Sequence, residues 1–353
     1  MKWKVEIGPC EIIRIAKDIR GYSWKSTIHP PRGHILLVHG LSTYSLFQWL
    51  RHSPPGEMEE RGLYYSSSLV EILNRLGMNV YAIDLEGHGL STHHEKPTMY
   101  MTRGLNGCID DIQHLLDIMR QRNPQLPIIM IGHSIGSLLI LRTSQQLREQ
   151  HKEKDVSGLI MIAPFIGSNH SVRFYQPIVK IGGFFYPKFI VTNGMKNSKM
   201  NQRVTGSIQL PPNLAARCRY PGLMIEKWAS IDQEADPLVH CPYSPIYIGL
   251  ISNIFEQVHK MNRLLQKSKK HAPFLIFHSP HDPICPYSSI VEFYNNSNVS
   301  PRSLVSLSDC LHNPLIEENT RPHLYAEITD WILVHLKVSI HISKNGRMGD
   351  TLS

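Results

Sequence analysis

The sharpest local signal in this sequence is Gly132-His133-Ser134-Ile135-Gly136. It directly follows an apolar run of strand length, residues 127–132, and it opens a helical stretch, residues 137–150. A serine between two glycines at such a place occupies a tight strand-to-helix turn, because a Cβ at either glycine would collide with neighbouring backbone. The turn exposes the Ser134 hydroxyl, and the N-terminus of the following helix favours negative charge there. We therefore predict that Ser134 is a nucleophile.

Apolar runs of similar length recur along the chain on both sides of this turn. Because their hydrophobicity is continuous rather than alternating, they are typical of strands covered on both faces, as in a parallel sheet. Residues 105–119 repeat apolar side chains at helical spacing, which predicts an amphipathic helix between two of the strands. Alternating strands and helices predict an α/β fold with a mostly parallel sheet and helices on both faces. The further runs are residues 34–39, 79–84, 158–163, 273–278 and 303–307.

The alternation stops between residues 165 and 271, where aromatic residues, proline and glycine dominate. We interpret this segment as a cap, or lid, inserted into the α/β core. A predicted helix at residues 321–336 closes the core, and the polar residues after it are predicted to form a mobile tail. The predicted organisation is residues 1–164 for the first part of the core, 165–271 for the cap, 272–338 for the second part of the core and 339–353 for the tail.

A serine hydroxyl needs a base to remove its proton and a third group to orient that base. Asp282 follows the strand predicted at residues 273–278, and His312 follows the last predicted strand. The order Ser134, Asp282, His312, with each residue just after a strand, is the order expected for this architecture. Asp309, three residues before His312, is an alternative orienting acid. We expect the side chain of His133, next to the serine, to point away from the site.

Acyl chemistry also needs donors for the tetrahedral oxyanion, and backbone N–H groups supply them. The N–H of Ile135, directly after the nucleophile, is one candidate. The loop after the first predicted strand offers the other, because Gly40 allows a close approach of backbone. We select the N–H of Leu41 as the second donor.

These motifs resemble those of the α/β-hydrolase superfamily, in particular its monoglyceride lipase and lysophospholipase branch. The resemblance extends over residues 33–336 and rests on His39-Gly40-Leu41, residues 84–91 (Asp-Leu-Glu-Gly-His-Gly-Leu-Ser), the stretch around Ser134, Asp282, His312, and a cap motif at residues 236–240. It implies the α/β-hydrolase fold, a lid over the serine, and Ser134, Asp282 and His312 as the catalytic triad. It also implies Leu41 and Ile135 as oxyanion donors. Residues 51–65 form a longer segment than is usual in such relatives, and we expect it to reshape the pocket mouth.

The formal net charge of +8 belongs almost entirely to the predicted cap. Residues 165–271 hold 14 basic and 5 acidic residues, whereas the two parts of the core nearly cancel. Lys180, Lys188 and Lys196 alternate there with aromatic residues, a composition that suits contact with an anionic lipid surface. The alternative is that the aromatic residues line the inner face of the cap while the lysines solvate its outside. No recognised motif accompanies the charge, so nucleic-acid binding is not expected.

Composition argues against several other classes of protein. Six cysteines without a C-x-x-C pair and 20 histidines without an H-E-x-x-H motif predict neither a disulfide framework nor a metal site. The N-terminus lacks an apolar segment of signal-peptide length, and no apolar run reaches the ~20 residues of a membrane-spanning helix. We expect a cytoplasmic protein in peripheral contact with membranes, without metal or organic cofactor.

The leading hypothesis is a serine hydrolase that cleaves carboxylic esters of monoacyl lipids, monoacylglycerol or lysophospholipid, through an acyl-enzyme. Two alternatives stay open. The same triad could serve another ester, thioester or amide, as in a thioesterase or an aminopeptidase. A protein that kept the fold only to bind a ligand would not need Ser134, Asp282 and His312 intact.

Overall fold

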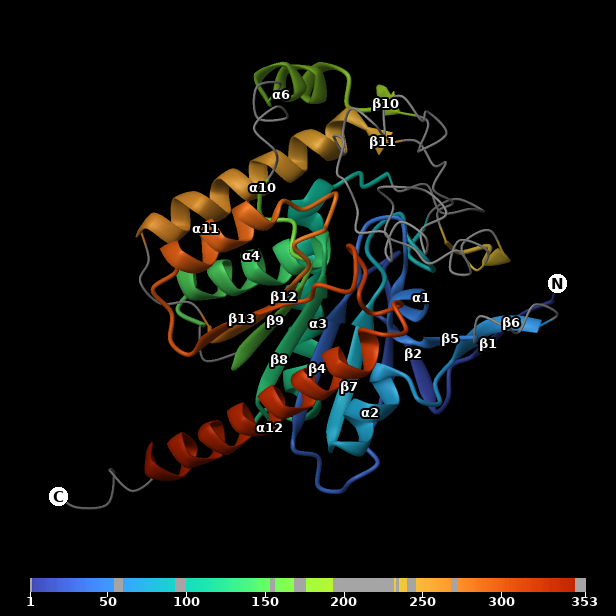
Figure 1. Ribbon diagram of the computed structural model, residues 1–353, viewed down its shortest axis with the longest axis vertical. Helices are drawn as coiled ribbons and strands as arrows, with labels where there is room; N and C mark the ends of the chain where they lie inside the picture. The colour runs from blue at the N-terminus through green and yellow to red at the C-terminus, as the bar shows by residue number, and fades with distance from the viewer. Residues whose placement is uncertain are drawn as a thin grey trace.

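The computed structural model describes residues 2–53, 60–92, 100–152, 156–167, 176–192, 232, 235–239, 246–267 and 272–346. A central sheet of eight strands runs through it in the order β13-β12-β9-β8-β4-β7-β3-β2 (Figure 1). The pairs from β13 to β7 are parallel, and β2 and β3 are added antiparallel at one edge. The strands are β2 (Cys10–Arg14), β3 (Arg20–Trp24), β4 (Gly33–Val38), β7 (Met78–Ile83), β8 (Ile128–His133), β9 (Gly158–Ile162), β12 (Phe274–His278) and β13 (Arg302–Ser306).

All six predicted strands are confirmed as members of this sheet, with bounds within one residue of the expected ones. Strands β4, β7, β8, β9 and β12 are buried at every position, which explains their continuous hydrophobicity. β13 is only partly buried because it forms the edge of the sheet. A mostly parallel α/β sheet is therefore the observed fold.

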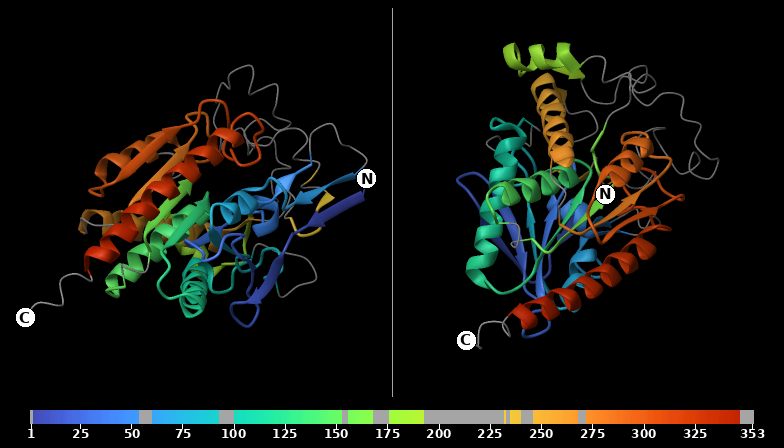
Figure 2. Two further views of the ribbon diagram at one scale, coloured as in Figure 1. Left: turned by 90° about the horizontal axis from the view of Figure 1, so that it is seen from below. Right: turned by 90° about the vertical axis from the view of Figure 1, so that its left-hand side faces the viewer.

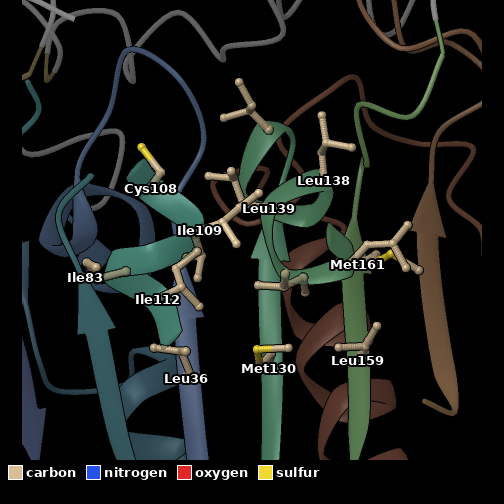
Figure 3. Close-up of a cluster of buried hydrophobic side chains, with 14 of the residues drawn as sticks. Leu36, Ile83, Cys108, Ile109, Ile112, Met130, Leu138, Leu139, Leu159 and Met161 are labelled. Carbon is tan, nitrogen blue, oxygen red and sulfur yellow. The ribbon is translucent and has the colours of Figure 1, made fainter. Parts of the chain in front are cut away.

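Helices cover both faces of the sheet and create two hydrophobic clusters. On one face lie α3 (Gly104–Arg122), α4 (Ile135–Glu149) and α11 (Tyr287–Asn296), and on the other α1 (Ser45–Trp49), α2 (Leu69–Arg75) and α12 (Arg321–Gly346). Successive strand residues point to opposite faces, so Leu36 joins the first cluster and Leu37 the second. Figure 3 shows Ile109 and Ile112 of α3 above Leu36 in the first cluster.

A second, smaller sheet near the N-terminus was not predicted. It has the order β1-β6-β5 and is formed by β1 (Lys2–Glu6), β6 (Glu60–Tyr64) and β5 (Arg51–His52). The long segment at residues 51–65 thus supplies two of its three strands. β5 has only two residues, and charged residues interrupt β1 (KWKVE) and β6 (ERGLY), so no continuous apolar run marked these strands.

The cap segment, residues 165–271, is described in part. It contains α6 (Gln176–Phe185), β10 (Ile190–Thr192), β11 (Ile246–Tyr247) and α10 (Ile248–Lys267). Side chains of α10, including Ile254 and Met261, join the first core cluster together with α3 and α4. Figure 1 and the right-hand view of Figure 2 place α6 on the side of α10 that faces away from the sheet. Lys196 and His240 lie outside the described residues.

The closing helix is longer than predicted. α12 continues from Arg321 to Gly346, into the stretch assigned to the polar tail, because no proline or glycine occurs between Pro322, in its first turn, and Gly346. Within the described part of the chain, no helix is both long and apolar enough to cross a membrane.

Candidate active site

Ser134 occupies a sharp turn between β8 and α4. Its φ of 53° is positive, a conformation that a residue with a side chain adopts only when its surroundings enforce it. The Ser134 N–H donates to the carbonyl of Ile162 at 2.9 Å. The Ser134 carbonyl accepts from the N–H groups of Ser137 and Phe165, each at 3.1 Å. Neighbouring backbone therefore holds the strained turn on both sides of the serine.

The two glycines of the turn are required by close packing. A Cβ on Gly132 would lie 2.6 Å from the backbone of Gly136, and a Cβ on Gly136 would lie 2.3 Å from the carbonyl oxygen of Val38. Ser137 adds a further contact, because its hydroxyl donates to the Gly132 carbonyl at 2.6 Å. The turn is thus packed against the end of β4 and closed by a side chain of α4.

The structure brings Ser134, His312 and Asp282 together from three loops at the ends of strands. His312 Nε2 lies 2.8 Å from Ser134 Oγ, and His312 Nδ1 lies 2.7 Å from Asp282 Oδ2. All three residues are buried. The Nδ1 partner is therefore Asp282 rather than the alternative acid, Asp309.

Asp282 is held as an anion that faces His312. Its other oxygen, Oδ1, accepts from the N–H groups of Ile284 at 2.8 Å and Cys285 at 2.9 Å. Burial alone would raise the pKa of the Asp282 carboxyl, but the charge and the hydrogen bond of His312 outweigh it, so the pKa lies below its usual value. A fixed carboxylate stabilises positive charge on His312.

His133 does not point away from the site, contrary to expectation. Its Nε2–H donates to the backbone carbonyl of His312 at 3.1 Å, and the two rings lie 5.1 Å apart. Burial, followed by the neighbouring His312, lowers the pKa of His133 to about 3, so the ring is neutral. The tight turn at Ser134 keeps the preceding side chain within hydrogen-bond reach of the loop that carries His312.

The predicted oxyanion donors lie on two segments next to the serine, a helix start and a loop. Ile135 is the first residue of α4, and Leu41 lies in the loop after β4, the strand that pairs with β8. A Cβ on Gly40 would lie 2.8 Å from His133 Nδ1 and 3.3 Å from Ser134 Cβ. The loop that carries Leu41 therefore passes directly beside the serine turn.

Within the described residues, one grouping of side chains has the spacing of a metal site. It consists of Asp282, Cys285 and His312, whose ligand atoms lie within 4.8 Å of one another. Burial raises the pKa of the Cys285 thiol well above its usual value, which disfavours the thiolate that a metal would need. Both ring nitrogens of His312 already face Ser134 and Asp282. The grouping therefore fits a proton relay better than a metal site.

Sequence reasoning missed the buried contacts between the segment predicted as a cap and residues 44–61. Arg61 Nη2 lies 3.1 Å from Asp232 Oδ2, and His52 Nδ1 lies 2.8 Å from the same oxygen. The Tyr44 hydroxyl donates to Asp236 Oδ2 at 2.8 Å. No local pattern marks these pairs, since the partners lie more than 150 residues apart in the sequence.

Comparisons with known proteins identify the family of this chain. The family model described as "Serine aminopeptidase, S33" matches residues 55–319. A Schizosaccharomyces pombe protein provisionally named monoglyceride lipase is 22% identical over 273 residues, 76% of this chain and 64% of that protein, so the chain spans less than two thirds of this relative. A monoacylglycerol lipase of Mycolicibacterium smegmatis is 20% identical over 310 residues, 87% of this chain and 90% of that protein.

A solved structure supports the same fold. The monoacylglycerol lipase of Paleococcus ferrophilus superposes with a TM-score of 0.63 at 20% identity, over 90% of this chain and 99% of that chain. At this level of identity the likeness concerns the fold.

Proposed function

Because the chain belongs to the serine aminopeptidase S33 family of α/β-hydrolases and is monoglyceride lipase-like, we propose that it is a serine hydrolase that cleaves carboxylic esters of monoacyl lipids. The proposed substrates are monoacylglycerols or lysophospholipids. The observation that carries the proposal is the unbroken chain of contacts from Ser134 Oγ through His312 to Asp282. The names of the relatives support the class of substrate.

The proposed reaction begins with attack of Ser134 Oγ on the ester carbonyl carbon. His312 Nε2 takes the hydroxyl proton as the new C–O bond forms, and Asp282 stabilises the resulting imidazolium through Nδ1–H. The carbonyl oxygen becomes an oxyanion, which accepts hydrogen bonds from the N–H groups of Leu41 and Ile135. The tetrahedral intermediate then expels the alcohol, which receives the proton from His312, and an acyl-Ser134 ester remains.

Water completes the proposed cycle. His312 removes a proton from a water molecule as it attacks the acyl carbon, and the second tetrahedral intermediate uses the same two oxyanion donors. Its collapse releases the fatty acid and returns the proton to Ser134. No step requires a metal or an organic cofactor.

Two experiments test this proposal. A fluorophosphonate probe should label the wild-type protein and not a Ser134→Ala variant, since the probe reacts with an activated serine. A panel of monoacylglycerols, lysophospholipids, aryl thioesters and aminoacyl amides should then rank monoacyl lipids first by kcat/KM. Absence of labelling of the wild type would support a binding protein, and preference for amides would support an aminopeptidase.

We also propose that the cap contacts anionic lipid through α6. None of the α6 side chains is buried, and exposed apolar residues follow one another along it and just beyond it: Ile178, Ile181, Phe184, Phe185, Tyr186 and Phe189. Lys180 and Lys188 are exposed beside them. Exposed apolar patches with cationic neighbours suit a lipid surface.

The opposite side of α6 explains why its apolar residues face outward. A Cβ on Gly182 would lie 2.6 Å from the Ile248 side chain, and a Cβ on Gly183 would lie 2.5 Å from the Ser252 side chain. The two glycines thus form a seam, the α6–α10 glycine seam, at which α6 lies against α10. This arrangement favours contact with lipid over the alternative in which the aromatic residues line the inside of the cap.

A further inference from the structure

The loop that carries the proposed donor Leu41 is held at both ends by the residues after β7. At its start, the Leu85 N–H donates to His39 Nε2 at 3.0 Å, so His39 carries its proton on Nδ1, which lies 2.6 Å from the Gly40 carbonyl. At its end, the Ser45 N–H donates to Asp84 Oδ1 at 2.9 Å. We call residues 39–45 the oxyanion loop.

The middle of the oxyanion loop contains a residue with a positive φ. Ser42 has a φ of 64°, in the left-handed region that costs energy for any residue other than glycine. Such a conformation persists only where surrounding contacts enforce it. The contacts after β7 support the ends of the loop, and a further contact lies two residues after Ser42, at Tyr44.

The cap makes such a contact through Tyr44. The Tyr44 hydroxyl donates to Asp236 Oδ2 at 2.8 Å, and Asp236 Oδ1 accepts from the Leu238 N–H at 2.9 Å. Tyr44 is 1% exposed and Asp236 is 4% exposed. Burial raises the pKa of Tyr44 well above its usual value, so the phenol keeps the proton that it donates. A buried polar pair of this kind is costly to separate.

The cap side of this contact is itself anchored. The Asp236 N–H donates to the carbonyl of Asp232 at 2.9 Å, and the Asp232 side chain faces Arg61 and His52 in a fully buried ionic cluster. Val239 packs into the same hydrophobic cluster as Tyr44. The segment at residues 235–239 therefore offers Tyr44 a fixed partner rather than a mobile one.

We propose that Asp236 is a positioning residue which acts through Tyr44, so that docking of cap residues 235–239 sets the geometry of the oxyanion loop. The inference rests on the proposed function, and it assigns to the cap a part in transition-state stabilisation in addition to covering the serine. Oxyanion donors act only at hydrogen-bond distance from the developing charge, and small displacements reduce the rate steeply.

Tyr44→Phe provides the direct test, because it removes one oxygen atom and keeps the ring. With a soluble aryl ester as substrate, kcat should fall roughly tenfold to a hundredfold while KM changes less than about twofold. The inhibition constant of an alkyl trifluoromethyl ketone, which forms a tetrahedral adduct on Ser134, should rise by the same factor as kcat falls. Tyr325→Phe is the matched control, since Tyr325 is a buried tyrosine of the same cluster on α12.

Substitution of Asp236 tests the same contact from the cap side. Asp236→Ala should reproduce the loss of kcat, whereas Asp236→Asn should recover most of it, because the amide can accept from the Leu238 N–H and donate to the Tyr44 oxygen. The double variant Tyr44→Phe with Asp236→Ala should lose no more than either single variant. If Tyr44→Phe does not fold, the comparison of Asp236→Ala with Asp236→Asn decides.

The outcomes separate this inference from the proposed function. An unchanged kcat in folded Tyr44→Phe, or a rise of KM alone, overturns the positioning role while Ser134-dependent hydrolysis by the wild type stands. An equal loss of kcat in Tyr325→Phe would show a general effect of removing a buried hydroxyl and would also overturn it. A wild type that neither reacts with a fluorophosphonate nor hydrolyses esters overturns the proposed function and this inference together.

Discussion

The serine turn and the outer cap helix are held in opposite ways. Ser134 is 7% exposed, and its backbone is bonded to the chain on both sides, so every neighbour restricts it. On α6, Phe184 is 80% exposed, and the helix meets α10 across a glycine seam. The residues proposed for the chemistry are therefore positioned by backbone packing. The helix proposed to contact substrate-bearing lipid, α6, is distinguished by its exposed apolar side chains.

The largest effect is expected from substitution of Asp282, the single carboxylate that orients His312. Asp282→Asn should lower kcat about 10⁴-fold, because an amide cannot hold the required tautomer of His312 or stabilise its charge. Steady-state kinetics with a soluble aryl ester measure this. Asp309→Asn is the matched control and should keep kcat within about threefold. A reversed order of the two variants would make Asp309 the orienting acid.

Removing the anion between the cap and the core should chiefly affect stability. Asp232→Asn removes the buried carboxylate that faces Arg61 and His52, and breaking a buried ion pair in this way costs about 3 to 5 kcal/mol in the free energy of unfolding. Urea denaturation checks the value. Asp117→Asn, which breaks an exposed pair with Arg120, should cost less than about 1 kcal/mol. Equal costs for the two variants would contradict a buried anchor for the cap.

Substitutions on the exposed helix α6 should weaken lipid contact without changing the rate of ester hydrolysis. Replacing Phe184 and Phe185 together by serine should weaken binding to anionic liposomes at low salt by roughly tenfold or more, because two large apolar side chains no longer enter the lipid. Hydrolysis of a soluble ester should stay unchanged. Ile12→Ser, which removes an exposed apolar residue from the core sheet, serves as the control. Sedimentation that is insensitive to the double substitution would refute the proposed lipid surface.

The smallest effect is expected from substitution of His133, the residue with a neutral ring that directly precedes Ser134. His133 has a pKa of about 3 in the folded protein and about 6.5 when unfolded, so between these values only the unfolded chain binds the proton. Stability that depends on His133 is thus lost as the pH falls from 6.5 towards 3. In His133→Gln the slope of unfolding free energy against pH should be lower by up to about 1.4 kcal/mol per pH unit. An unaltered slope in His133→Gln would refute a neutral His133.

The sheet was predictable because strands such as β4 and β8 are buried throughout, so their sequences are apolar without interruption. Ser134, Asp282 and His312 could be placed next to one another because each directly follows a parallel strand, and such strand ends share one edge. The direction of the His133 side chain was not predictable, since a turn with positive φ breaks the alternation of faces. The hydrogen bond from Tyr44 to Asp236 was also not predictable from the sequence, because 192 positions separate the two residues.

Substitutions should have different effects on the two sides of α6, the outer side and the side at the α6–α10 glycine seam. A substitution on the outer side of α6 changes the exposed surface of the helix and leaves the fold of the core unchanged. A methyl group added at Gly182 or Gly183 would act as a wedge and push the whole helix outward. Substitutions on the outer side can therefore change the exposed side chains without moving α6, whereas substitutions at the seam change the position of the helix itself.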